Sequence, residues 1–115
     1  MGTDCVFCRI AAHELPATIV HEDAETLAFR DVDPRAPVHV LIIPKRHIGS
    51  VNELGEIGAE LIGRLFVVAR DIAIVEGVAE GGYRLVMNTG PDAGQTVAHA
   101  HLHLLGGRAL RWPPG

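Results

Sequence analysis

The sequence predicts a single small domain that combines short β-strands with one long and one short helix. Histidines and aliphatic residues alternate over 99–105, which is the two-residue period of a strand. Apolar residues recur every three or four positions over 56–75, which is the period of an amphipathic helix. The chain has 115 residues, which is the length of one domain, so we expect one unit over 1–115.

Composition excludes several classes of protein. The net charge of -4 argues against binding to a nucleic-acid backbone as the main activity. The longest aliphatic run, over 40–43, is too short to span a bilayer, and we find no signal peptide. The chain has only 2 cysteines, which favours a reducing compartment over a secreted disulfide scaffold. We therefore expect a cytoplasmic protein with no membrane or nucleic-acid partner.

The first half of the chain predicts a short helix followed by three strands. The helix runs from Cys5 to about Ala12, with Asp4 as its N-cap. Strands are expected over 18–21, 26–31 and 38–43, the first two around an acidic turn and the third ended by Pro44. Asp31, at a strand end, could bind a ribose hydroxyl pair or cap the turn that follows it. Residues 45–47 form a small basic cluster that is typical of a solvated turn.

The second half begins with the long helix over 56–75. Its apolar stripe is formed by Ile57, Leu61, Leu65, Val68, Ile72 and Val75. A second apolar band on this helix consists of Ile62, Phe66 and Ala69. The band predicts a subunit interface, although a wide core within one monomer would give the same pattern. A strand over 83–88 and a glycine-containing loop over 89–96 follow. Such loops direct backbone N–H groups toward an anion, and Gln95 and Thr96 add uncharged hydrogen-bonding groups.

The last strand carries three histidines on one face: His99, His101 and His103. The outer two lie about 13 Å apart along a strand, so the three must have different roles. A solvated strand face is one interpretation, and a pair of metal ligands is another. In a third, the middle imidazole attacks phosphorus and forms a covalent intermediate while its neighbours handle charge and protons.

The two cysteines form a Cys-x-x-Cys pair, Cys5 and Cys8. A redox role would need a preceding strand and a βαβ context, which the sequence lacks. A tetrahedral zinc site would need two further ligands, and other histidines could supply them: His13, His21, His39, His47 or a member of the histidine row. Two buried thiols without a ligand are the simpler alternative.

Taken together, these motifs resemble the histidine triad (HIT) proteins of the Hint branch, which are nucleotide-binding hydrolases with a His-x-His-x-His motif. The resemblance covers nearly the whole chain and is most specific at the triad with its Gly94-Gln95-Thr96 lead-in. It also rests on Phe29-Arg30-Asp31, Ala36-Pro37-Val38-His39, Ile43-Pro44-Lys45, Asn88, Gly106-Gly107-Arg108 and Trp112-Pro113-Pro114-Gly115. The resemblance implies an α+β fold with a five-stranded antiparallel sheet, and a homodimer that joins two sheets.

The resemblance also implies an activity and a set of site residues. The expected reaction is hydrolysis of purine nucleoside 5′-phosphoramidates to the monophosphate through a nucleotidyl-histidine. His101 would be the nucleophile, held and polarised by His39, with His99 and His103 as its triad neighbours and His103 on the phosphate. Thr96 would lie near the leaving group. The remaining contacts would come from Asn88 and the backbone of Gly94, Gln95 and Thr96 to the phosphate, from Asp31 and Val32 to the ribose, and from Val6, Phe7, Ile10 and Phe29 to the base.

The cysteine pair is similar to that of zinc-bearing members of the superfamily. By that similarity the ligands would be Cys5, Cys8, His47 and His99. Four protein ligands leave no open position, so the zinc would be structural and the chemistry would need no cofactor. Two other functions stay open. The protein could be a nucleotide-binding regulatory module with little turnover, or a metal hydrolase that uses the triad as ligands.

Overall fold

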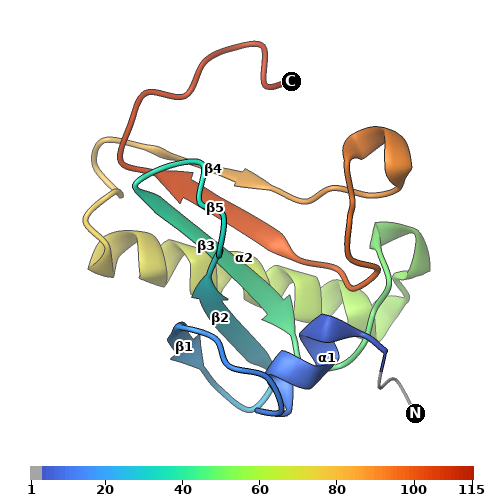
Figure 1. Ribbon diagram of the computed structural model, residues 1–115. Helices are drawn as coiled ribbons and strands as arrows, with labels where there is room; N and C mark the ends of the chain where they lie inside the picture. Colours follow the sequence, from blue (N-terminus) through green and yellow to red (C-terminus); the bar gives the residue numbers. More distant parts are fainter. Residues whose placement is uncertain (1–3) are drawn as a thin grey trace.

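The computed structural model describes residues 4–115 as one five-stranded sheet with a helix on each face (Figure 1). The strand order is β1-β2-β3-β5-β4, and every neighbouring pair is antiparallel. The strands are β1 (Ile19–Glu22), β2 (Thr26–Arg30), β3 (Val38–Pro44), β4 (Tyr83–Val86) and β5 (Leu102–Gly106). The expected α+β fold with five antiparallel strands is confirmed.

The central strand β3 is buried on both faces of the sheet, and its side chains alternate between two cores. Val40 and Ile42 pack against α2 (Glu56–Val75), which crosses one face of the sheet. Leu41 and Ile43 pack on the other face, against α1 (Val6–Ala11). The α1 core is small, and it lies at the end of the sheet where the cysteines and histidines gather.

Two predicted boundaries near the histidines are wrong. The N-cap of α1 is Cys5 rather than Asp4, because Cys5 Sγ accepts a hydrogen bond from the Cys8 backbone N–H at 3.3 Å. Strand β5 begins at Leu102, where the ladder with β3 ends at the pair Ile42 and Leu102. Pro44 has no N–H with which to extend the ladder. His99 and His101 therefore precede the strand, and only His103 lies within it.

Helix α2 has the predicted bounds, but its apolar faces differ from the prediction. Ile57 and Val75 are 65% and 82% exposed at its two ends, so they do not belong to the core stripe. Ala69 is fully buried in the α2 core rather than in a second band. Phe66 and Val67 are exposed near the middle of the helix. Nothing among residues 4–115 is a helix with the length and hydropathy to cross a membrane.

Candidate active site

Four histidines lie on or directly beside β3 and β5, in two groups. His39 comes from β3 and His103 from β5, two ladder positions apart and therefore on the same face of the sheet, because His103 pairs with Leu41 and Leu105 pairs with His39. The ring of His101 lies 5.0 Å from that of His103. The ring of His99 turns away toward His47, at a centroid distance of 4.9 Å. The predicted single row of three is thus divided: His101 and His103 face His39, and His99 faces the cysteines.

Hydrogen bonding fixes the tautomer of His101. Its Nδ1 lies 2.7 Å from the backbone oxygen of His99. A carbonyl oxygen only accepts, so Nδ1 carries the proton and Nε2 carries the lone pair. Within residues 4–115, Nε2 makes no side-chain hydrogen bond, yet no fully buried side-chain nitrogen or oxygen lacks a partner. Nε2 of His101 is therefore an accessible nucleophilic nitrogen on an otherwise buried ring.

A second chain of hydrogen bonds fixes the tautomer of His103. The Arg35 backbone N–H donates to Nδ1 of His39 at 3.0 Å, so His39 carries its proton on Nε2. That Nε2 lies 3.0 Å from Nδ1 of His103, which must accept. His103 then carries its own proton on Nε2. One imidazole in the site thus offers a lone pair, and its neighbour offers an N–H donor.

Burial keeps this second chain neutral at physiological pH. Burial lowers the pKa of His103 to about 4, and the nearby His101 and His39 add to the effect. Burial also lowers the pKa of His39, although the carboxylate of Asp31 opposes it. The neutral tautomers of His39 and His103 are therefore the forms present near pH 7.

The structure does not support the predicted contact between His39 and His101. Nε2 of His39 faces His103, and the group that holds His101 is the main-chain oxygen of His99. A sequence pattern carries no signal for a main-chain partner of this kind. The same is true of the Arg35 N–H, which sets the state of His39.

Asp31 closes a turn and also touches the histidine chain. Its Oδ1 accepts from the Asp33 backbone N–H at 2.8 Å, so the turn-capping interpretation is correct. Its Oδ2 lies 3.3 Å from Nε2 of His39. Asp31, His39 and His103 are close enough to hold a metal ion. However, the Arg35 N–H occupies Nδ1 of His39, so Nε2 keeps its proton and is not available as a ligand.

The cysteines form a second cluster with His47 and His99, as the resemblance implied. Cys5 Sγ lies 3.3 Å and Cys8 Sγ 3.5 Å from Nδ1 of His99, and Cys8 Sγ lies 3.2 Å from Nδ1 of His47. Nε2 of His99 lies 2.8 Å from the Pro44 oxygen, so it carries the proton and leaves a lone pair on Nδ1. Burial and the neighbouring Cys5 raise the pKa of the Cys8 thiol to about 11. The four residues could hold a metal ion.

The loop before the histidines is built around Gln95. Its side-chain oxygen accepts from the Gly90 N–H at 2.9 Å, and its amide nitrogen donates to the oxygens of Gly49 at 2.7 Å and Val97 at 3.0 Å. The side chain is therefore occupied within the protein, which contradicts its predicted role as a free group for an anion. Gly90 and Gly94 have φ values of 83° and 85°, a conformation that favours glycine.

The other predicted substrate contacts are not gathered at one end of the sheet, since Thr96 lies beside the cysteines and Val32 lies between β2 and β3. Thr96 is exposed and shares a hollow of about 400 Å³ with Val6, Cys5 and His47. Asn88 is half-buried just after β4. Val32 is 99% exposed beside Asp31. The predicted base-pocket residues Phe7, Ile10 and Phe29 are buried in the α1 core, with the two phenyl rings edge to face at 5.5 Å.

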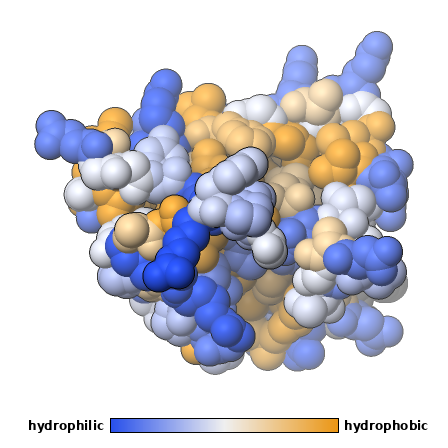
Figure 2. Space-filling model, turned by 90° about the horizontal axis from the view of Figure 1, so that it is seen from above, coloured by the Kyte–Doolittle hydropathy of each residue, from blue (hydrophilic) through white to orange (hydrophobic). Residues whose placement is uncertain are grey.

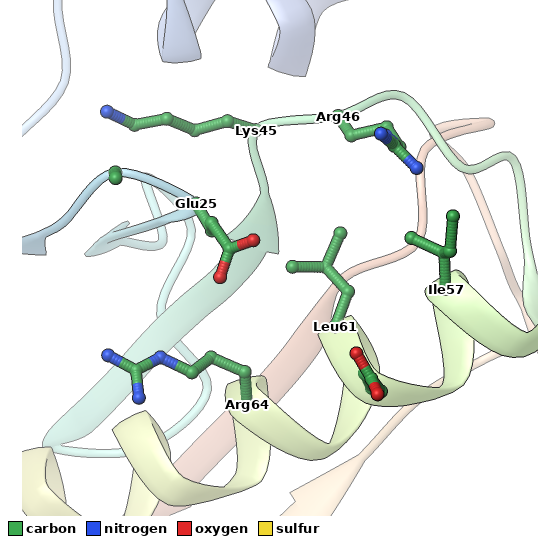
Figure 3. A pocket seen from close by; sticks show the side chains of 8 residues that line it. Glu25, Lys45, Arg46, Ile57, Leu61 and Arg64 are labelled. Atoms are coloured by element: carbon green, nitrogen blue, oxygen red, sulfur yellow. The ribbon is translucent and has the colours of Figure 1, made fainter.

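A separate hollow of about 430 Å³ lies between the first turns of α2 and the ends of β2 and β3 (Figure 3). Leu61 and Ile57 of α2 face it from one side and Glu25 and Arg46 from the other. Its lining mixes both signs of charge: Glu25, Lys45, Arg46, Glu60 and Arg64. None of the four site histidines lines it, so we place the chemistry at the histidines.

Comparison with known proteins gives consistent results. A family model described as HIT domain matches residues 12–110. An uncharacterized HIT-like protein from Synechococcus elongatus is 53% identical over 115 residues, which is 100% of each chain. The crystal structure of a HIT family hydrolase from Legionella pneumophila has a TM-score of 0.94 at 52% identity, covering 96% of this chain and 99% of that one. A histidine triad nucleotide-binding protein from Candida albicans has a TM-score of 0.81 at 31% identity, covering 95% and 82%.

Proposed function

This chain belongs to the HIT domain family, and from that premise we propose that it hydrolyses the P–N bond of purine nucleoside 5′-phosphoramidates. The similarity to a hydrolase of the family supports a hydrolytic reaction, and the similarity to a nucleotide-binding relative supports a nucleotide substrate. The observation that carries the proposal is the tautomer of His101, whose Nδ1–H is held by a carbonyl while Nε2 is free to attack. A ring in that state is a ready nucleophile.

In the first step, Nε2 of His101 attacks phosphorus and the P–N bond to the leaving amine breaks. The amine takes up a proton from solvent as it leaves. His101 becomes a nucleotidyl-imidazolium, and its Nδ1–H, now more acidic, donates a stronger hydrogen bond to the His99 carbonyl. In the second step, water attacks the same phosphorus, the bond to Nε2 breaks, and the nucleoside monophosphate leaves. Two displacements let water enter only after the amine has gone.

We assign His103 to the charge that develops on the phosphoryl oxygens. Its Nε2–H is the donor that remains once Nδ1 accepts from His39. A neutral imidazole donor can bind the phosphoryl oxygens while the adjacent His101 acquires its positive charge, with no second cation beside it. We propose that Thr96 acts near the leaving group and Asn88 near the phosphate, and that Asp31 and Val32 act near the ribose.

We propose further that Cys5, Cys8, His47 and His99 hold a structural zinc ion. Zinc–sulfur and zinc–nitrogen bonds of about 2.3 and 2.0 Å in a tetrahedron place S and N about 3.5 Å apart. The separations of 3.2, 3.3 and 3.5 Å in this cluster are close to that value. The His99 Nε2–H also donates to Pro44, the kind of outer contact that orients a ligating imidazole. The ion would tie α1 to the segment before β5.

We also propose that two copies of the chain form a homodimer. Helix α2 exposes four large apolar side chains that a subunit interface would bury: Phe66, Val67, Ile74 and Val75. Strand β4 is at the edge of the sheet, where its outer backbone groups have no strand partner among residues 4–115. The face seen from above, toward the end of the molecule where β4 lies, carries apolar patches between hydrophilic side chains (Figure 2). Light scattering coupled to size exclusion would measure the mass in solution.

The test of the proposed function is turnover of adenosine 5′-phosphoramidate. We expect release of AMP and ammonia by the wild type, and loss of at least about a thousand-fold in kcat for His101→Ala, since removal of a nucleophile leaves only binding effects. His13→Ala is the matched control, because His13 is exposed and, among residues 4–115, its side chain bonds only to Glu22. Full activity of His101→Ala would reject the assignment. Binding of the nucleotide by wild type without turnover would instead favour the regulatory module.

A further inference from the structure

His99 belongs to both groups of the site at once. Its ring joins the cluster of Cys5, Cys8 and His47 through Nδ1, and its Nε2–H donates to Pro44. Its main-chain oxygen accepts the Nδ1–H of His101 at 2.7 Å. One residue thus connects the four ligands to the nitrogen that would attack phosphorus.

We propose that His99 is a positioning residue that transmits the state of the cysteine–histidine cluster to the nucleophile. Its ring, held in the closed cluster, sets the direction of its carbonyl, and the carbonyl selects the reactive tautomer of His101. The inference rests on the proposed function only for its effect on turnover. The tautomer of His101 is a property of the protein alone.

The segment around His99 is buried, but few main-chain hydrogen bonds hold it among residues 4–115. It precedes β5, so its backbone is outside the sheet ladder. Its main-chain anchors are a hydrogen bond from the His99 N–H to the Val97 oxygen at 2.8 Å and one from the Ala100 N–H to the Ile48 oxygen at 2.6 Å. Ile48 directly follows the ligand His47 in the chain, so this second anchor also depends on the cluster.

The other support for His101 is Phe7, which lies between the two cysteines in the sequence. Its ring packs edge on against His99 at 6.0 Å and His101 at 5.1 Å. Phe7 sits on α1, a helix of 6 residues whose N-cap is the ligand Cys5. A helix this short is not stable by itself. Opening the cluster would therefore loosen the ring packed on His101 as well as the carbonyl bonded to it.

The expected consequence is a change in which ring nitrogen of His101 carries the proton. With the carbonyl displaced, the proton can move to Nε2, and that tautomer has no lone pair facing the substrate. Loss of contacts that orient a site from its outer layer typically costs 10- to 100-fold in activity. We expect a fall of that size in kcat with an unchanged KM, because no group that touches the substrate is removed.

The experiment compares the wild type with Cys8→Ser, which removes one ligand atom that contacts neither His101 nor the substrate. The primary readout is the ¹⁵N NMR spectrum of the full chain labelled at histidine. The signals of His101 are those that disappear in His101→Gln. Zinc-loaded wild type should have its proton on Nδ1 of His101. Cys8→Ser should have lost zinc, should populate the Nε2–H tautomer, and should have a kcat lower by about 10- to 100-fold. His13→Gln is the control and should match the wild type.

A zinc-free Cys8→Ser that keeps both the Nδ1–H tautomer and the kcat of the wild type would overturn the proposal. If Cys8→Ser does not fold, the same spectra are recorded on wild type stripped with a chelator and then returned to zinc. The Nε2–H form of His101 should then appear when zinc is removed and disappear when zinc is returned. A spectrum that does not change on removal of zinc would also overturn the proposal. If the wild type does not hydrolyse the phosphoramidate, the proposed function is rejected. The spectra would still show whether the cysteine–histidine cluster controls the tautomer of His101.

Discussion

Replacing His39 by leucine tests the hydrogen-bonded chain that sets the state of His103. The substitution removes two hydrogen bonds of 3.0 Å, one from the Arg35 N–H and one to Nδ1 of His103. At about 1 kcal/mol each, their loss should lower the free energy of unfolding by about 2 kcal/mol. The freed Nδ1 can then carry the proton in place of Nε2. The bond from His39 selects the donor tautomer of His103, and its loss at about 1 kcal/mol should lower kcat about five-fold, since about 1.4 kcal/mol is one factor of ten.

Adenosine phosphoramidate turnover at pH 7 and NMR titration of His103 measure the two effects. The pKa of His103, about 4 in the wild type, should rise in His39→Leu because the His39 ring contributes to its depression. His39→Gln is the matched variant, since its side-chain amide can still donate to Nδ1 of His103, and it should recover much of the activity. A leucine variant with the kcat and the His103 pKa of the wild type would refute the reasoning.

Three further outcomes are expected. Gln95→Ala removes three hydrogen bonds that close the loop before the histidines, so the free energy of unfolding should fall by about 2 to 3 kcal/mol in urea titrations, and an unchanged midpoint would exclude this role. The pKa of His103 is about 4 against an ordinary 6.5, so the unfolded chain binds the proton more tightly. Stability should therefore be full above pH 6.5 and decline as pH falls toward 4, by at most about 3 kcal/mol from this group, which urea midpoints at pH 7 and 4.5 would detect. Metal analysis of untagged protein should find one zinc per chain, and a chelator should lower the Tm of wild type while leaving Cys8→Ser unchanged; metal-free wild type with the same Tm would contradict the zinc assignment.

The fold could be predicted from the sequence because its signals are local. The aliphatic run ended by Pro44 and the three- to four-residue period over 56–75 place β3 and α2 within one or two residues of their observed ends. The errors are tertiary in origin. Ile57 and Val75 fit a helical stripe, but both are exposed in the fold, and the helical period alone does not tell which members of a stripe are covered by the rest of the chain.

The candidate site was predicted as a set of residues but not as a geometry. The alternation at 99–105 identifies three histidines, yet a proline on the neighbouring strand ends the ladder at Leu102 and lets His99 turn to the cysteines. The groups that set each tautomer are main-chain atoms of Arg35, Pro44 and His99. Every residue has such atoms, so no sequence pattern could indicate which of them would be used. Gln95 is the opposite case: its residue type suggested a ligand contact, and the fold uses all of its hydrogen-bonding groups.

The most direct test of the proposed mechanism is the mass of the protein during turnover. Wild type mixed with adenosine 5′-phosphoramidate is quenched within milliseconds into alkaline denaturant, and the intact chain and its peptides are weighed. A covalent adenylyl group on His101, absent from His101→Ala and lost with time as AMP appears, is the predicted result. Rapid turnover with no adduct at any quench time, or inversion of configuration at phosphorus, would mean that water attacks directly and that no bond to His101 forms.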